Sequence, residues 1–116
     1  MEKETQPGNF LGSLGLAMRA GKVVSGEFMT ERAIREGRAG LVIVAADASA
    51  GTKKKFNDSC TFYKVPIYIL SDKETLGHSL GKKERASLAV IDEGFAGSIR
   101  KKIIGEVTQH GKNEDL

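Results

Sequence analysis

The chain has few of the side chains that build disulfides, metal sites and membrane spans. Its 116 residues include one cysteine, no tryptophan and only two histidines, His78 and His110. Cys60 therefore cannot form an internal disulfide, and neither histidine belongs to an H-x-x-x-H or C-x-x-C spacing. No apolar run approaches the roughly 20 residues that cross a bilayer, and the polar start MEKETQPG does not resemble a signal peptide. These absences predict a soluble, cytoplasmic protein without a metal or a cofactor.

The sequence also lacks an evident catalytic apparatus. It contains no glycine-rich phosphate loop of the Walker or dinucleotide type. Cys60 recurs with Phe56 and Tyr63 at helical spacing, which favours a small buried residue over a nucleophile. Asp47 follows an apolar run, where functional residues are common, but a carboxylate there also suits hydrogen bonds from loop amides. An RNA-modifying methyltransferase would need a cofactor domain for which this chain is too short. We therefore predict that the protein is not an enzyme.

What the chain does contain is an excess of positive charge in its middle. Lys and Arg total 18 against 15 Asp and Glu, which gives a formal net charge of +3. Both ends are acidic, so residues 8–105 carry 16 basic and 10 acidic side chains, or about +6. This balance favours a polyanionic partner, although many soluble domains share it.

Helical and apolar stretches alternate along the chain. Apolar residues at helical spacing, followed by glycine, predict helices that end at Gly21, Gly37 and Gly81. Continuous apolar runs at 41–46, 67–70 and 88–91 predict buried strands. The alternation predicts a three-layer α/β/α sandwich with a mostly parallel, mixed sheet of about four strands. We expect one domain over residues 9–106, with a mobile N-terminal tail at 1–8 and a mobile C-terminal tail at 107–116.

The second expected helix carries candidate binding residues. Phe28, Arg32 and Arg35 share one of its faces. Guanidinium groups pair with phosphates, and an aromatic ring can stack on an unpaired base. The alternative is that Phe28 packs under the first helix and that the arginines are only solvated. At Ser25 and Gly26 the start of the helix offers free backbone N–H groups to a phosphate.

Two longer stretches resemble a known family. The stretches AGKVVSG…RAIREGRAGLVIVAADAS and VPIYILSDKETLGHSLGKK are similar to the kink-turn RNA-binding ribosomal protein family, which includes the ribosomal proteins L-seven-Ae and L-thirty-e. Its bacterial YlxQ-type members are those that the chain resembles most. The resemblance covers residues 9–106. It implies an α/β/α sandwich that binds RNA through the start of the second helix and the loop before the last strand.

The resemblance also implies individual site residues. Gly26 matches the glycine of the family's G-x-N-E-x-x-K motif, Arg32 takes the lysine position, and Lys73 matches the basic residue of K-x-x-L-G. Where the motif has Asn-Glu, the pair that contacts the guanines of a kink-turn, this chain has Phe28-Met29, which cannot make those polar contacts. Gly81 begins the RNA-facing loop. The expected RNA-binding residues are Lys22, Ser25, Gly26, Phe28, Arg32, Lys73, Gly81, Lys82, Lys83 and Arg85.

The sequence thus predicts a non-catalytic protein that binds structured, kink-turn-like RNA in a ribosome or ribosomal RNA context. Ribosomal or assembly proteins are further expected partners. The alternative is a protein-interaction module on the same fold, in which Phe28-Met29 forms an apolar patch. RNA binding would weaken with salt, because each phosphate contact releases condensed counterions, and this separates the two hypotheses.

Overall fold

Helices and strands alternate through residues 9–115, the part of the chain that the computed structural model describes. The N-terminal tail expected at residues 1–8 lies outside this part. The helices are α1 Phe10–Arg19, α2 Glu27–Arg35, α3 Ala50–Tyr63, α4 Lys73–Ser79 and α5 Glu93–Asp115, and the strands are β1 Val23–Ser25, β2 Leu41–Val44, β3 Ile67–Ile69 and β4 Ser87–Val90.

Glycine caps end three of the helices where the sequence predicted. Gly21, Gly37 and Gly81 follow α1, α2 and α4 with φ angles of 75°, 75° and 71°. In each case the backbone makes the paired hydrogen bonds of a Schellman turn, for which glycine suits the left-handed position. At the start of α1, the Asn9 side chain accepts a hydrogen bond from the Leu11 N–H at 2.6 Å and so caps the helix.

The sheet has the strand order β1-β4-β2-β3. β2 pairs with β3 in parallel, whereas β4 is antiparallel to both of its neighbours, β1 and β2. The three-layer sandwich is confirmed and the sheet is mixed and four-stranded, but the prediction of a mostly parallel sheet is wrong. Two of its three pairings are antiparallel.

The direction of β4 follows from the loop that precedes it. The Lys82 N–H donates to the Gly77 carbonyl (2.8 Å) and the Arg85 N–H donates to the Lys73 carbonyl (3.1 Å). Residues 81–86 therefore run back along α4 to its first turn. Since α4 begins just after β3, β4 starts at the end of the sheet where β3 stops and runs in the opposite direction. A buried apolar run predicts a strand but carries no information about its direction.

β1 is a strand that the apolar runs did not predict, because three residues are too few to show a period. It pairs with β4, with Val23 opposite Val90 and Ser25 opposite Leu88. The Gly26 N–H then donates to the Ser87 carbonyl at 2.9 Å. The start of α2 is thereby fixed beside the start of β4.

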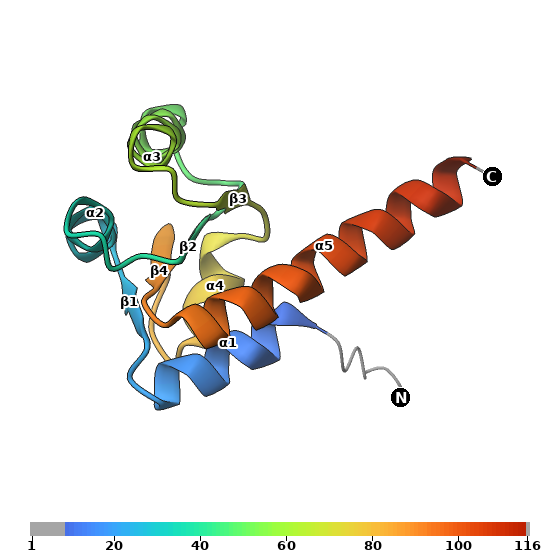
Figure 1. The fold of residues 1–116 in the computed structure, drawn as a ribbon, viewed down its shortest axis with the longest axis horizontal. Helices are drawn as coiled ribbons and strands as arrows, with labels where there is room; N and C mark the ends of the chain where they lie inside the picture. The colour runs from blue at the N-terminus through green and yellow to red at the C-terminus, as the bar shows by residue number, and fades with distance from the viewer. Residues whose placement is uncertain (1–8, 116) are drawn as a thin grey trace.

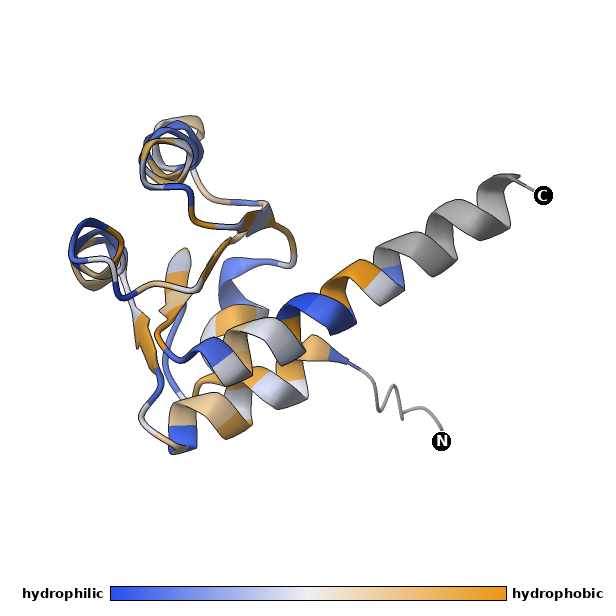
Figure 2. Ribbon diagram, in the orientation of Figure 1, coloured by the Kyte–Doolittle hydropathy of each residue, from blue (hydrophilic) through white to orange (hydrophobic). Residues whose placement is uncertain are grey.

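Helices cover the sheet on both faces. α2 and α3 lie on one face, and α1, α4 and α5 on the other (Figure 1). All four residues of β2 are fully buried between these layers, as its unbroken apolar sequence predicted. Figure 2 shows hydrophobic residues concentrated on the strands and on the helix faces that turn toward them. None of the helices in residues 9–115 is both long and apolar enough to cross a membrane.

α5 continues as a helix through residues 107–115, beyond the domain boundary expected at residue 106 (Figure 1). The sequence analysis expected a tail there, because these residues show no apolar periodicity. The structure shows that the backbone of residues 107–115 is helical. The domain boundary and the mobility of this segment stay predictions.

Candidate functional site

Most of the predicted binding residues lie at one end of the sheet. β1, β2 and β3 end there and β4 begins there. Ser25 is the last residue of β1, Gly26 precedes α2, Lys73 is the first residue of α4, and Arg85 lies just before β4. The loop between α4 and β4 supplies the rest. We call this set the binding edge: Ser25, Gly26, Lys73, Gly81, Lys82, Lys83 and Arg85.

The loop of residues 81–86 is fixed at several points. Besides its backbone hydrogen bonds to α4, the Ala86 carbonyl accepts a hydrogen bond from the Ala45 N–H, just beyond β2, at 2.9 Å. Arg85 Nε donates to Ser25 Oγ at 2.9 Å, and Arg85 Nη1 donates to the Glu84 carbonyl at 2.9 Å. Ser25 and Arg85 were predicted separately as binding residues. The structure places them in direct contact across 60 positions of sequence.

Gly77 allows this loop to approach α4 so closely. A Cβ atom at position 77 would overlap the Lys83 carbonyl oxygen and lie 2.6 Å from the Lys83 carbonyl carbon. Any side chain there would push the loop away from the helix. The sequence analysis did not assign Gly77 to the site, although it is the glycine of the K-x-x-L-G motif that pointed to the loop.

The arginines of α2 are paired with carboxylates. Arg32 Nε lies 3.0 Å from Glu36 Oε2, and Arg38 Nε lies 2.9 Å from the other oxygen of the same carboxylate. The hydrogen bonds from Arg32 and Arg38 lower the pKa of Glu36. Arg35 Nη1 lies 3.7 Å from Glu31 Oε2. The predicted aromatic-and-arginine face therefore carries less free charge than its sequence suggests.

The cations of the binding edge have no such partners. No carboxylate oxygen of residues 9–106 lies within 4.0 Å of the side-chain nitrogens of Lys73, Lys82, Lys83 or Arg85. Lys82 and Lys83 are exposed, and Lys73 and Arg85 are half-buried. Of the Arg85 nitrogens, Nη2 has no acceptor among the described residues, so it is free to donate to a ligand.

Acidic side chains at this end of the sheet bind backbone amides instead. Asp47 Oδ1 accepts from the Lys73 N–H at 3.0 Å, and Asp72 Oδ1 accepts from the Thr75 N–H at 2.7 Å. The hydrogen bonds from Thr75 lower the pKa of Asp72. Asp47 thus accepts an amide hydrogen bond, as one of the two sequence interpretations proposed, although the amide belongs to α4 rather than to its own loop. Both carboxylates stabilise the start of α4.

The first turn of α2 has backbone N–H groups without an acceptor among residues 9–106. Gly26 has φ 94° and ψ 159°, a conformation that is essentially restricted to glycine. It provides no side-chain cap, and the N–H groups of Glu27, Phe28 and Met29 have no acceptor within residues 9–106. The open N–H groups that the sequence predicted at Ser25-Gly26 thus belong to the next three residues, because the Gly26 N–H itself is bound to Ser87.

Three predicted residues lie outside the binding edge. Lys22 is at the opposite end of β1, where its carbonyl accepts from the Ile91 N–H at 2.9 Å. Arg32 lies in the second half of α2 and pairs with Glu36. Phe28 follows Gly26 by two residues and is 68% exposed, so the interpretation that it packs under α1 is wrong.

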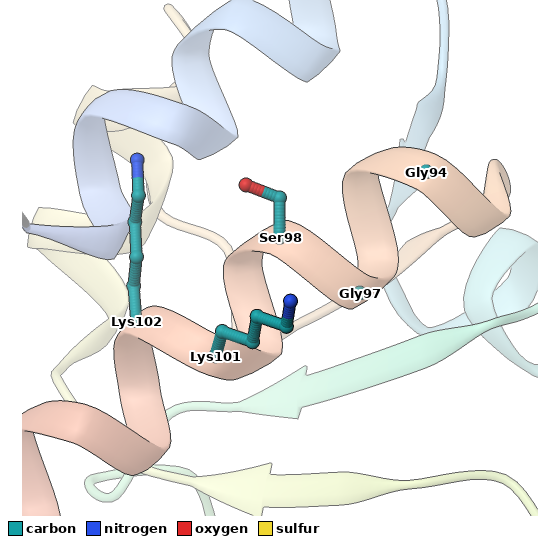
Figure 3. A pocket seen from close by; sticks show the side chains of 5 residues that line it. All are labelled: Gly94, Gly97, Ser98, Lys101 and Lys102. Atoms are coloured by element: carbon teal, nitrogen blue, oxygen red, sulfur yellow. The ribbon is translucent and has the colours of Figure 1, made fainter.

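A second basic feature lies on α5. It is a depression of about 500 Å³ lined by Gly94, Gly97, Ser98, Lys101 and Lys102 (Figure 3). Lys102 extends toward α1, where Nζ donates to Ser13 Oγ at 2.6 Å. The depression begins at the first turn of α5, which follows the end of β4 opposite to the binding edge.

Cys60 belongs to the core. Its side chain is 1% exposed, and burial raises the pKa of the thiol to about 12. A buried thiol of this kind is unreactive, which supports the interpretation of Cys60 as a core residue. Residues 9–106 contain no cluster of histidine, cysteine, aspartate and glutamate side chains that could hold a metal ion.

Comparison with known proteins finds relatives along most of the chain. The model of the Ribosomal protein L7Ae/L30e/S12e/Gadd45 family matches residues 9–99. The chain belongs to this family. Among the L7Ae-type relatives, the RNA-binding protein YlxQ of Bacillus subtilis (strain 168) is 49% identical over 86 residues, which are 74% of this chain and 86% of the relative. The family and the YlxQ-type resemblance that the motifs indicated are confirmed.

Two solved structures show the same L7Ae-type fold. A protein with unknown function from Bacillus halodurans C has a TM-score of 0.79 at 37% identity, over 81% of this chain and 95% of that one. The Giardia lamblia 15.5kD RNA binding protein has a TM-score of 0.73 over 94% of this chain and 92% of its own, and at 20% identity it shows the fold alone.

Proposed function

We propose that this chain is a non-catalytic RNA-binding protein of the cytoplasm that holds a folded RNA at the binding edge. One observation carries the proposal: Lys73, Lys82, Lys83 and Arg85 lie on a fixed loop and helix start without a carboxylate partner among residues 9–106. Cations that are not neutralised within the protein attract phosphates. Since the backbone that carries them is already ordered, binding loses little conformational entropy. The relatives named as RNA-binding proteins support this function.

The expected test is a titration of structured RNA at several salt concentrations. With about four phosphate contacts, the logarithm of the binding constant should fall by roughly three units per tenfold increase in salt. Fluorescence anisotropy with a labelled RNA hairpin between about 50 and 200 mM salt measures this slope. Binding that is absent, or that does not change with salt, would favour the protein-interaction module instead.

We extend the proposal to kink-turn-like RNA in a ribosome or ribosomal RNA context, with ribosomal or assembly proteins as neighbours. The support is the family's motif, of which Gly26, Lys73 and Gly77 are present and Asn-Glu is replaced by Phe28-Met29. The protein would then recognise the shape and phosphates of such an RNA, because the side chains of Phe28 and Met29 cannot make the polar contacts to guanine edges that Asn and Glu make.

This substitution leads to a specificity prediction. Replacing the tandem sheared G·A pairs of a kink-turn RNA with Watson–Crick pairs, in a variant that keeps the bend, should change affinity by less than about tenfold. A good bidentate base contact is worth roughly 1–3 kcal/mol, and two such contacts are absent here. Affinities of both RNAs at one salt concentration decide the matter. A larger loss would mean that backbone groups or other side chains contact the guanines.

A further inference from the structure

β3 forms one edge of the sheet and has a strand on one side only. In the order β1-β4-β2-β3 it pairs with β2 and with no other strand of residues 9–115 (Figure 1). Its sequence, Ile-Tyr-Ile, is β-branched and aromatic and contains no charge. Edge strands usually carry a charged residue, a proline or a bulge that prevents pairing with another chain. β3 is short, which is one such protection, but its residues favour pairing.

The register with β2 shows which backbone groups of β3 point outward. The Leu70 N–H donates to the Val44 carbonyl at 3.0 Å, and Val44 is opposite Ile69. In a parallel ladder, Tyr68 then directs both its N–H and its carbonyl toward β2. Ile67 and Ile69 direct theirs away from the sheet, where these groups have no backbone partner among residues 9–106.

Exposed apolar side chains gather beside this open edge. Arg100 Nε of α5 donates to Tyr68 Oη at 3.1 Å, so Tyr68 points to the α5 face and the two isoleucines of β3 point to the α3 face. On that face Ile69 is 38% exposed. α3 ends just before β3 with Phe62 and Tyr63, two exposed rings whose centroids lie 4.9 Å apart. The packing within one copy of the chain leaves these groups uncovered.

We propose that β3 pairs with β3 of a second copy of this chain, antiparallel about a two-fold axis at Tyr68. Ile67 of each copy is then opposite Ile69 of the other, and each of these two pairs exchanges both of its N–H···O=C hydrogen bonds. The isoleucine side chains contact each other across the join on the α3 face. All the outward backbone groups of β3 are satisfied, and the two sheets form one continuous sheet with a self-complementary interface.

The charges at the two ends of β3 favour a second copy over an unrelated strand. Lys64 lies three residues before the strand and Asp72 three residues after it. Antiparallel pairing brings the start of one strand beside the end of the other, so Lys64 of each copy lies near Asp72 of the other. Lys64 is exposed and has no carboxylate partner among residues 9–106.

This pairing goes beyond the proposed function and does not depend on it. β3 ends at the binding edge, and the two-fold axis reverses the second copy, so the two binding edges lie at opposite ends of the joined sheet. A three-residue strand covers less than the roughly 1,200 Å² of a stable interface. The dimer should therefore be weak and form at high local concentration.

The first test is sedimentation of the full chain without RNA. Between about 10 µM and 1 mM the wild type should show a monomer–dimer equilibrium with a dissociation constant of roughly 100 µM. Ile69→Pro removes an outward N–H but no bond to β2, and Ile69→Lys places a charge in the edge. Each should weaken the dimer at least tenfold. Ile104→Lys on α5 is the matched control, because Ile104 is 43% exposed, and it should leave the equilibrium unchanged.

A crosslink tests the register. Opposed Tyr68 residues form a non-hydrogen-bonded pair with Cα atoms about 4.5 Å apart, a distance that a disulfide can span. Tyr68→Cys should therefore form a covalent dimer under mild oxidation, whereas Ile104→Cys should not. Cys60 is buried and should not compete.

Several results would overturn the pairing. These are a wild type that stays monomeric at about 1 mM, an Ile69 variant that dimerises as tightly as the wild type, and equal weakening by Ile104→Lys. Failure of Tyr68→Cys to crosslink, or equal crosslinking of Ile104→Cys, would do the same. If Ile69→Pro does not fold, which its melting curve shows, Ile69→Lys and the crosslink decide. None of these results bears on RNA binding.

Discussion

Gly77→Ala should both destabilise the protein and weaken RNA binding, although alanine is the better helix former. A methyl group at position 77 would overlap the Lys83 carbonyl oxygen and lie 3.0 Å from Glu84 Cα. These are backbone atoms of the loop, so no side-chain rotation can relieve the overlap. The loop must move away from α4, which breaks the hydrogen bonds from Lys82 to Gly77 and from Arg85 to Lys73.

The expected loss of stability is about 1–3 kcal/mol, the usual range for overpacking, and the melting temperature should fall by roughly 5–15 °C. RNA affinity should fall by about tenfold or more, because Lys82, Lys83 and Arg85 leave their positions together. Thermal unfolding and an anisotropy titration measure the two effects.

Gly97→Ala is the matched control for Gly77→Ala. Gly97 also lies within a helix, but a Cβ atom there would meet nothing within 4 Å. The same substitution should therefore stabilise the protein by up to about 1 kcal/mol through helix propensity and leave RNA affinity unchanged. Equal effects at the two positions would show that the close approach of the loop to α4 does not matter for the site.

The sequence predicted the elements better than their arrangement. Glycines at 21, 37 and 81 ended helices where the pattern indicated, because a left-handed C-cap is a local requirement that glycine meets. The buried run at 41–46 became the central strand β2 for an equally local reason. The direction of β4 was not predictable in this way. It depends on hydrogen bonds between Arg85 and Lys73 and between Lys82 and Gly77, which only the folded chain brings together.

The site likewise combines features that the sequence predicts with features that depend on the folded chain. Lysines and arginines are visible in the sequence, but whether a carboxylate neutralises them depends on packing. Arg32 pairs with Glu36, just after its own helix, and Lys55 pairs with Glu27 on α2. Lys82 and Lys83 have no carboxylate partner within residues 9–106. Lys22 was predicted to be a binding residue, yet it precedes the unpredicted strand β1 and so lies at the other end of the sheet.

The double variant Lys82→Ala, Lys83→Ala should lose about half of the electrostatic part of RNA binding. Both side chains are exposed and without a carboxylate partner among residues 9–106, so their removal leaves the fold intact and takes away two phosphate contacts. Affinity at moderate salt should fall by roughly 100-fold or more, since hydrogen bonds to charged groups contribute about 1.5–3 kcal/mol each. The salt slope should decrease by about 1.5 units.

The chain offers a control with the same change in net charge. Lys54 and Lys55 are also adjacent and exposed, but Lys54 Nζ lies 2.9 Å from Asp58 and Lys55 Nζ lies 2.8 Å from Glu27. The double variant Lys54→Ala, Lys55→Ala removes two positive charges from α3 that are already paired with carboxylates. If RNA affinity depended only on net charge, both double variants would lose the same affinity. If the RNA binds at the α4–β4 loop, only the Lys82, Lys83 variant should lose affinity.

The most direct test of RNA binding at this edge is therefore the salt dependence of affinity for one structured RNA, measured side by side for the wild type and these two variants. Our account predicts that the slope of the Lys82, Lys83 variant falls by about 1.5 units while the slope of the Lys54, Lys55 variant stays at the wild-type value. Equal slopes for the two variants, or a larger loss in the α3 variant, would contradict it and place any RNA contact elsewhere on the molecule.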